Sequence, residues 1–220
     1  MMSRLSRHIA PWLMLIGFVP MTALAHPHGW VDYRVVLHFD DQARVVALEQ
    51  VWKMDPFYSL TLTEELARAA GEESMEQRLD MLGEEIAQNL RGEHYLTHVA
   101  HAGERVDLGD LRDYSIRQND DQRLTFRFVV PLAEPLALGG SPLTWQIYDD
   151  TYYIEFLYDP DADTPIALHN APTDCASRVI AADPDPQRVA DAAALDRDAA
   201  APSGLGRFFA ETGEVTCPAL

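Results

Sequence analysis

Hydrophobic and polar residues alternate along the segment that begins near residue 29. The hydrophobic positions are Val31, Tyr33, Val35, Leu37 and Phe39. A period of two is typical of a strand that buries one face. Residues 40–42 (Asp-Asp-Gln) supply turn chemistry, and residues 45–52 are a second β-rich run. Residues 29–53 are therefore predicted to form a β-hairpin.

Two helical segments are predicted after this hairpin. Residues 54–59 (Met-Asp-Pro-Phe-Tyr-Ser) interrupt the β pattern, and a helix is expected over residues 62–70. A second helix is expected from residue 75 to a stop at Gly92, because its hydrophobic residues recur at helical spacing. Each helix is preceded by the spacing of a capping box. The two pairs are Thr61 with Glu64 and Ser74 with Gln77.

The rest of the chain again has β character. Candidate strands cover residues 94–100, 104–108, 112–118, 123–131, 143–149, 152–158 and 175–181. Short strands at such spacing predict an α+β fold with a mainly antiparallel, sandwich-like β body. The two helices would be inserted after the first hairpin and cover one face of a sheet.

The chain is predicted to have three parts. Residues 1–25 form a signal peptide, residues 26–181 the α+β domain, and residues 182–220 a C-terminal extension. Within the extension, residues 182–204 are rich in Ala, Asp and Pro, with a short helix expected near 187–197.

The first residues have the pattern of an export signal. Arg4 and Arg7 precede a short apolar run over residues 11–21, and residues 22–25 (Thr-Ala-Leu-Ala) form an A-x-A cleavage site. The apolar run is shorter than the ~20 residues that span a bilayer. We expect export through the Sec pathway to the periplasm and cleavage after Ala25; the alternative is an uncleaved N-terminal anchor.

The two cysteines fit an exported chain. Cys175 and Cys217 are 42 positions apart, and the exported compartment is oxidising. A disulfide between them would close the C-terminal extension onto the body. A thiolate metal site is the alternative, although the C-x-x-C spacing of such sites is absent.

Acidic residues outnumber basic residues by 35 to 17, which gives a net charge of −18. Binding to nucleic acid or to an anionic membrane is disfavoured, because both need a clustered basic face. The acid excess is consistent with a well-solvated surface; a field that attracts cations is the alternative.

Cleavage after Ala25 would expose the sequence His26-Pro27-His28. An α-amine and two imidazoles can each lose a proton near neutral pH, and their nitrogen lone pairs can then bind copper, nickel, zinc or cobalt. Pro27 has no amide proton, which blocks the square-planar site that uses the amides of residues two and three. A brace-like or shared site on His26 and His28 remains; a frayed terminus without an ion is the alternative.

Other candidate ligands lie further along the chain. Asp55 and Asp149 sit at β ends and could complete a metal site, although each alone also reads as a turn residue. Asp32 is about 13 Å from His28 along a regular strand, so it needs a bend or another role, such as pairing with an arginine. Asp150 adjoins Asp149 and has the same two interpretations, as a metal ligand or as a turn residue.

Two further sets of motifs bear on chemistry. His94, His98 and His101 would share a face on a helix, but this segment reads as a strand and favours a structural or surface role. No G-x-S-x-G, H-E-x-x-H or glycine-rich phosphate loop is present. We therefore expect no enzymatic activity.

Several motifs together resemble one bacterial family. They are residues 26–32 (His-Pro-His-Gly-Trp-Val-Asp), 39–41 (Phe-Asp-Asp), 54–59 (Met-Asp-Pro-Phe-Tyr-Ser), 148–153 (Tyr-Asp-Asp-Thr-Tyr-Tyr), Cys175 and 215–218 (Val-Thr-Cys-Pro). In combination and order they resemble the domain-of-unknown-function 1007 family over nearly all of residues 26–218. Members are labelled periplasmic components of uncharacterised ABC-type transport systems and are associated with nickel/cobalt permeases.

The resemblance implies that the chain handles a divalent transition metal outside the cytoplasmic membrane. Many relatives carry a calcium-loop-like stretch after a phenylalanine motif. Met54 stands in place of that phenylalanine, and residues 60–90 contain no D-x-[DN]-x-[DN]-G run, so a calcium site is not expected.

These observations lead to two hypotheses. The first is a monomeric metal-binding accessory protein of an inner-membrane metal permease or ABC transporter, with the ion at His26 and His28 and with Asp55 or Asp149 completing the site. The second is a docking or structural subunit of a transporter without an ion, in which Trp30, Tyr152 and Tyr153 line the interface. A copper oxidase and a two-lobed substrate-binding protein are disfavoured.

Overall fold

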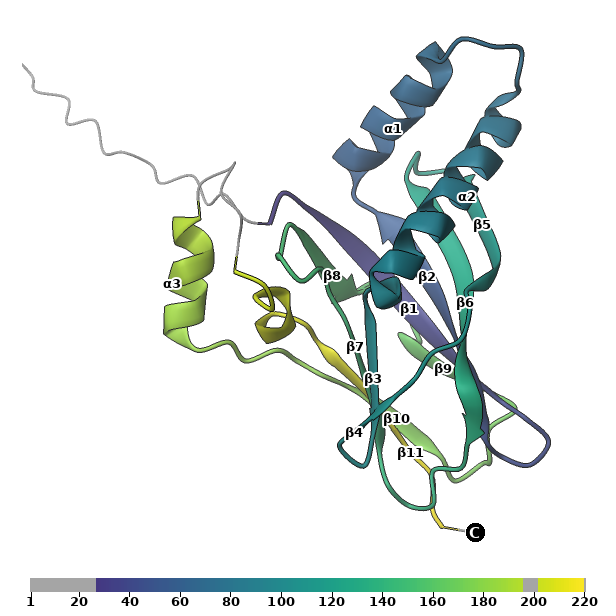
Figure 1. The fold of residues 1–220 in the computed structure, drawn as a ribbon, viewed down its shortest axis with the longest axis vertical. Helices are drawn as coiled ribbons and strands as arrows, with labels where there is room; N and C mark the ends of the chain where they lie inside the picture. Colours follow the sequence, from purple (N-terminus) through teal and green to yellow (C-terminus); the bar gives the residue numbers. More distant parts are fainter. Residues whose placement is uncertain (1–26, 196–201, 220) are drawn as a thin grey trace, which may run out of the picture.

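The computed structural model of this chain describes residues 27–195 and 202–219. Within them the chain forms two β-sheets and three α-helices (Figure 1). One sheet has six strands: β1 (Gly29–Phe39), β2 (Val45–Met54), β5 (Arg112–Gln118), β6 (Leu124–Leu136), β8 (Ile154–Tyr158) and β9 (Ile166–His169). The other has five: β3 (Thr97–His101), β4 (Glu104–Val106), β7 (Leu143–Ile147), β10 (Ala176–Ile180) and β11 (Thr212–Thr216). The predicted signal peptide and the predicted first mature residue, His26, both lie outside the described residues.

The strand order confirms the predicted α+β fold with a sandwich-like body. The six-stranded sheet runs β5-β6-β2-β1-β8, with β9 as a sixth strand that also pairs with β1, and the five-stranded sheet runs β10-β11-β7-β3-β4. The predicted hairpin is the antiparallel pair β1–β2. β8 and β9 instead pair in parallel with β1. β9 was not anticipated, because it is only four residues long.

The core lies between the two sheets, and it follows the alternation seen in the sequence. Tyr33, Val35 and Leu37 of β1 are fully buried, as are Leu143 and Ile147 of β7. Burial of such side chains stabilises the fold by roughly 1.5–3 kcal/mol each.

One buried polar residue also joins the sheets. Gln50 of β2 donates from its amide nitrogen to the Thr97 hydroxyl of β3 and accepts from the Trp52 indole, each at 2.9 Å.

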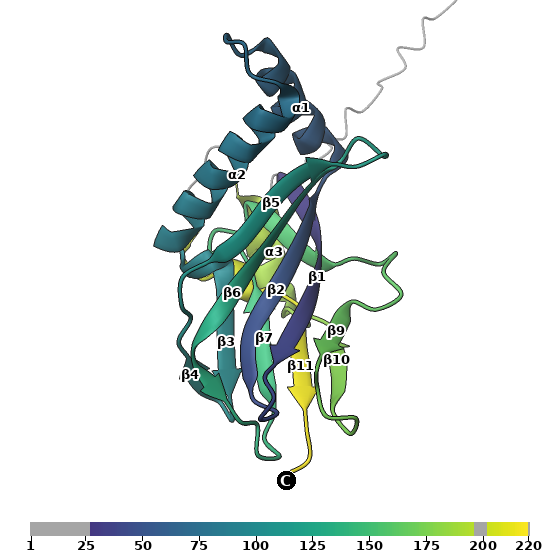
Figure 2. The same ribbon diagram turned by 90° about the vertical axis from the view of Figure 1, so that its right-hand side faces the viewer.

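α2 (Met75–Gly92) covers the part of the six-stranded sheet that the second sheet leaves open. Its N-cap Ser74 and Gln77 form the predicted capping box. Gly83 faces Ile116 of β5 so closely that a β-carbon there would lie 3.2 Å from the Ile116 side chain. Figure 2 shows α2 lying along β5.

α1 (Pro56–Arg68) begins six residues earlier than the sequence predicted, because Asp55 caps it. Thr61, taken as the cap, lies inside the helix and donates its hydroxyl to the Phe57 carbonyl at 3.0 Å. Ser59 is the one buried residue of this helix. α1 and α2 extend past the end of the sandwich that is opposite the C-terminus (Figures 1 and 2).

The C-terminal segment returns to the body. After α3 (Pro186–Ala194), β11 inserts between β10 and β7. Cys175 and Cys217 form a disulfide beside the β10–β11 pair, which confirms the predicted pairing. A disulfide is consistent with an extracytoplasmic location.

Candidate functional site

Three of the four predicted metal ligands lie around the start of β1. The His28 amide donates to the Tyr153 carbonyl at 2.9 Å, and the Tyr153 amide donates to Asp149 Oδ2 at 2.8 Å. Asp55 approaches from the other side, where its amide donates to the Trp30 carbonyl at 3.1 Å. The fold therefore brings His28, Asp55 and Asp149 into one neighbourhood, although they are far apart in sequence.

Asp55 has a structural task in this neighbourhood. It is 5% exposed, and its Oδ1 accepts from the amides of Phe57 and Tyr58 at 2.9 Å each. An Asp before a Pro at the first helical position is a strong helix start. Oδ2 faces Gly29, where a β-carbon would lie only 2.9 Å from it, so β1 approaches α1 through a residue without a side chain.

Asp149 also has its carboxylate occupied by the protein. Its Oδ1 accepts from the Thr151 amide at 3.0 Å, and the Thr151 hydroxyl lies 3.0 Å from both oxygens. Its Oδ2 accepts from the amides of Tyr153 and Ile154 at 2.8 and 3.2 Å. A carboxylate offers about four acceptor sites, and these contacts fill them. In this conformation Asp149 holds the turn before β8 in place.

His28 itself is exposed, and its orientation is fixed. Its ring stacks on the Tyr153 ring with 4.4 Å between centroids and 22° between planes. The backbone bond to Tyr153 adds a second restraint. Because the His28 ring and backbone are already restrained, binding of a ligand would cost less conformational entropy than at a free terminus.

Exposed aromatic side chains surround this neighbourhood, and we call Trp30, Phe57, Tyr58 and Tyr153 the aromatic surface. Their exposed fractions are 42, 78, 46 and 51%. Burial raises the pKa of Tyr58, and Glu65 and Asp55 raise it further, so its phenol stays protonated. Phe57 and Tyr58 were missed in the sequence because residues 54–59 read as a break.

Tyr152, expected with Trp30 and Tyr153 at an interface, is not on the surface. It is 7% exposed, and its ring stacks on Phe209 at 4.1 Å between centroids. It belongs to a small second core with Ala192 and Leu205, which attaches the C-terminal segment to the turn before β8. The alternation of exposed and buried tyrosines at this turn could not be read from sequence.

Asp32 pairs with an arginine, which was one of the two roles that the sequence left open for it. Arg123 lies 2.6 Å from Asp32 Oδ2, and the same guanidinium donates to the Met54 and Lys53 carbonyls at 2.6 and 3.0 Å. The pair joins the β5–β6 turn to the ends of β1 and β2. Asp32 is thus a structural residue next to the site.

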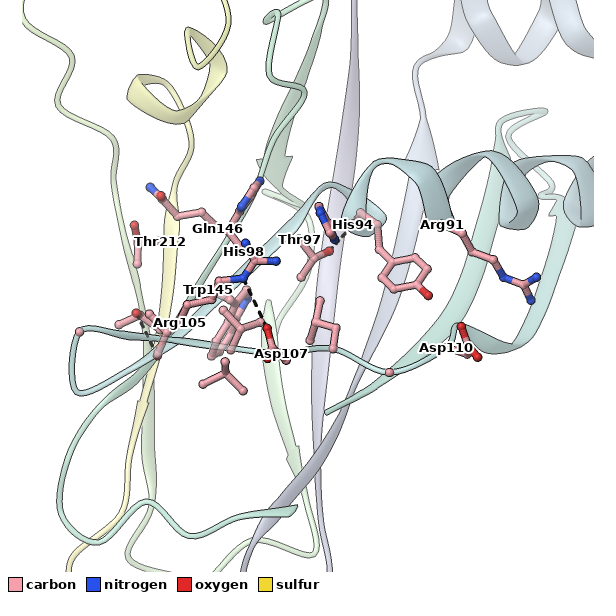
Figure 3. Close-up of a pocket in the computed structure, with 18 residues that line it drawn as sticks. Arg91, His94, Thr97, His98, Arg105, Asp107, Asp110, Trp145, Gln146 and Thr212 are labelled. Carbon is pink, nitrogen blue, oxygen red and sulfur yellow. Dashed lines mark hydrogen bonds and ion pairs between the residues drawn. The ribbon is translucent and has the colours of Figure 1, made fainter. Parts of the chain in front are cut away.

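A separate cavity of about 860 Å³ opens on the outer side of β3 and β7 (Figure 3). His94 and His98 line it together with Arg91, Arg105, Asp107 and Asp110. Arg105 approaches Asp107 at 3.6 Å. The two arginines and two aspartates balance, so the cavity has no marked preference for the sign of a ligand. His101 points elsewhere and bonds the Leu138 carbonyl at 3.0 Å.

His98 should titrate below the ordinary histidine range. Burial lowers its pKa and Arg105 lowers it further, while Asp150 partly opposes them. Since the folded-state pKa is depressed, His98 stabilises the fold fully above about pH 6.5 and this contribution is lost as pH falls through the folded pKa. An NMR titration should place its midpoint below 6.5.

The Arg105→Gln variant should raise that midpoint, and Arg68→Gln on α1 should leave it unchanged. A midpoint at or above 6.5 in the unmodified protein would contradict this assignment of the His98 environment.

Residues 27–195 and 202–219 contain no group of three or more His, Cys, Asp or Glu side chains that could hold a metal ion. In the same part of the chain, none of the helices is both long and apolar enough to cross a membrane.

The sequence matches the family described as protein of unknown function (DUF1007) over residues 12–217. The chain belongs to this family. It is also similar to an uncharacterized protein of Haemophilus influenzae, with 24% identity over 208 residues that cover 93% of this chain and 97% of the relative. The DUF1007 match spans both sheets, the helical pair and the disulfide, so the whole described fold belongs to the family.

Proposed function

We propose that this DUF1007 protein is a periplasmic accessory protein of a metal transport system and holds a divalent transition ion at its mature N-terminus. His26 supplies an amine and an imidazole, and His28 supplies a second imidazole. Nickel, cobalt, zinc and copper all suit such nitrogen ligands. A membrane permease or ABC transporter is the partner that gives or receives the ion.

The observation that carries the proposal is the fixed and exposed position of His28. Its backbone and ring are both held by Tyr153, immediately before β1 begins. A ligand two residues from the cleaved end is therefore anchored to a rigid sheet. A site built on a rigid element holds its geometry better than one on a free terminus.

In this proposal the two aspartates position the site and do not coordinate the ion. Asp55 caps α1 beside Gly29, and Asp149 orients Tyr153 through its amide. This modifies the expected ligand set, in which either carboxylate completed the metal shell. The ion would then be held by nitrogen donors, with water in the remaining positions.

A titration of correctly processed, metal-free protein with nickel, cobalt, copper and zinc tests the proposal. His28→Ala should weaken binding at least about tenfold, which corresponds to about 1.4 kcal/mol. The matched variant His169→Ala removes another exposed histidine and should bind normally. Binding should also weaken below about pH 6, because protons compete for the same nitrogens.

An extra alanine before His26 separates the two forms of the site. It moves the amine away from the His26 ring, so a brace-like site should lose affinity. Unchanged binding would leave only the shared imidazoles, and indifference of the native terminus to all four ions would refute the proposal.

A docking or structural subunit without an ion is the alternative, and the aromatic surface favours it. Clustered exposed aromatic residues are common at protein interfaces. Trp30→Ser with Tyr153→Ser should then abolish chelator-insensitive cross-linking to a membrane permease. Met81→Ser, which changes an exposed apolar residue on α2, should preserve cross-linking.

A further inference from the structure

The outer face of the six-stranded sheet contains a hollow of about 390 Å³ with a cationic lining. Arg34 of β1, Arg117 of β5 and Arg127 of β6 all line it. The strand register places Arg34 opposite Val51, and Val51 opposite Arg127. Residues paired across neighbouring strands share a face, so these arginines come from three strands of one surface.

Among the residues that the structure describes, two of these arginines have no acidic partner, although the protein is acidic. Of the fourteen basic side chains in residues 27–195 and 202–219, ten lie within 4.0 Å of a carboxylate. The four without such a partner in that part of the chain are Arg34, Arg91, Arg117 and Arg207. With 35 acids and 17 bases in the sequence, two unpaired guanidiniums in one hollow are unexpected.

The third arginine is already neutralised. Arg127 pairs with Glu49 at 2.6 Å, and Glu49 also lies 3.0 Å from His38 Nε2. Burial would raise the pKa of Glu49, but Arg127 and His38 outweigh it and hold the pKa below the usual range. Glu49 is the one carboxylate among the lining residues, and its charge is satisfied there.

The remainder of the lining combines a nonpolar floor with neutral hydrogen-bonding groups. Val51 and Ala167 supply apolar surface, and Ser115, Asn119 and Thr125 supply hydroxyl and amide groups. Asn119 donates to the Thr125 hydroxyl at 2.7 Å, so this part is ordered. Such a lining suits an organic molecule with a carbon skeleton and anionic ends.

We propose that this hollow binds a small organic polyanion through Arg34 and Arg117. Guanidinium groups recognise carboxylates and phosphates with paired, charge-assisted hydrogen bonds. β1 and β5 are three strand spacings apart, about 14 Å at the backbone, so a ligand with two separated anionic groups fits better than a single ion. A citrate-like polycarboxylate satisfies both arginines, and inorganic phosphate satisfies one.

The inference does not depend on the terminal metal site. Arg34 is about 20 Å from His28 along β1, and no residue is shared between the two sites. The acidic surface elsewhere repels anions, so the field of the molecule favours this face for an anionic ligand.

Calorimetric titration of the processed protein with citrate and, separately, phosphate in metal-free, low-salt buffer tests the proposal. The double variant Arg34→Gln and Arg117→Gln should weaken citrate binding at least about tenfold. The double variant Arg91→Gln and Arg207→Gln removes the same charge from the other unpaired arginines. It should bind citrate as the unmodified protein does.

Each outcome decides the matter. Citrate bound more tightly than phosphate, and lost only in the first double variant, supports the proposal. An equal loss in both variants would show general electrostatic attraction and overturn it. Absence of saturable binding of either anion to the unmodified protein would overturn it as well. Circular dichroism of both variants separates a lost site from a lost fold.

Discussion

Replacing Arg123 with glutamine should destabilise the protein by about 3 kcal/mol. The change leaves Asp32, whose side chain is 12% exposed, without its charge partner. Removing one member of a buried ion pair costs about 3–5 kcal/mol, and the residual exposure of this pair places it at the lower end. The Met54 and Lys53 carbonyls also lose their donor.

Urea denaturation of a set of variants separates these contributions. Asp32→Asn should cost about 1–2 kcal/mol, because Arg123 keeps its carbonyl bonds. The double variant that combines Arg123→Gln with Asp32→Asn should be more stable than Arg123→Gln alone, because it leaves no buried charge unpaired. Arg112→Gln, which breaks an exposed pair with Asp113, should change stability by less than about 1 kcal/mol. Equal effects of Arg123→Gln and Arg112→Gln would show that burial of the pair is unimportant.

Local sequence patterns predicted the elements whose stability is local. The alternation over residues 29–39 gave the correct strand and the correct buried face, because a period of two needs only one covered side. The Ser74–Gln77 capping box gave the correct start of α2. Both signals are complete within a few residues.

The start of α1 shows where two local signals competed. Asp55-Pro56 is a turn signal as well as a helix start, and residues 54–59 were interpreted as a break before a helix over residues 62–70. In the structure Asp55 is a helix cap: its Oδ1 accepts from the amides of Phe57 and Tyr58, and its Oδ2 faces Gly29 of β1. Thr61 carries the residue type of a cap but sits one turn inside the helix.

The candidate site depends on contacts that sequence patterns do not encode. His28 is held by Tyr153, 125 positions later, through the parallel pairing of β1 with β8. Asp149 was expected to offer free lone pairs, but amides of its own turn fill them. The structure brings His28, Asp55 and Asp149 near one another, but the roles of the two aspartates follow from tertiary contacts that the sequence does not show.

Replacing both Cys175 and Cys217 with serine should destabilise the protein by about 4 kcal/mol. The crosslink closes a loop with a sequence separation of 42 residues, and the chain-entropy estimate for such a loop is of this size. The effect should be concentrated in β10, which is the edge strand of its sheet and has no buried residue. β11 keeps its pairing with β7 and should remain protected.

Denaturant unfolding of the oxidised, reduced and serine-substituted proteins measures this contribution. The reduced protein and the double serine variant should unfold at the same midpoint, below that of the oxidised protein. Hydrogen exchange should accelerate first in β10 (Ala176–Ile180) and only later in β11 (Thr212–Thr216). The reason is that β11 pairs with a strand on each side, whereas β10 is at the edge of the sheet. If β11 exchanges as fast as β10 after reduction, the C-terminal segment depends on the crosslink for its docking and the sheet alone does not retain it.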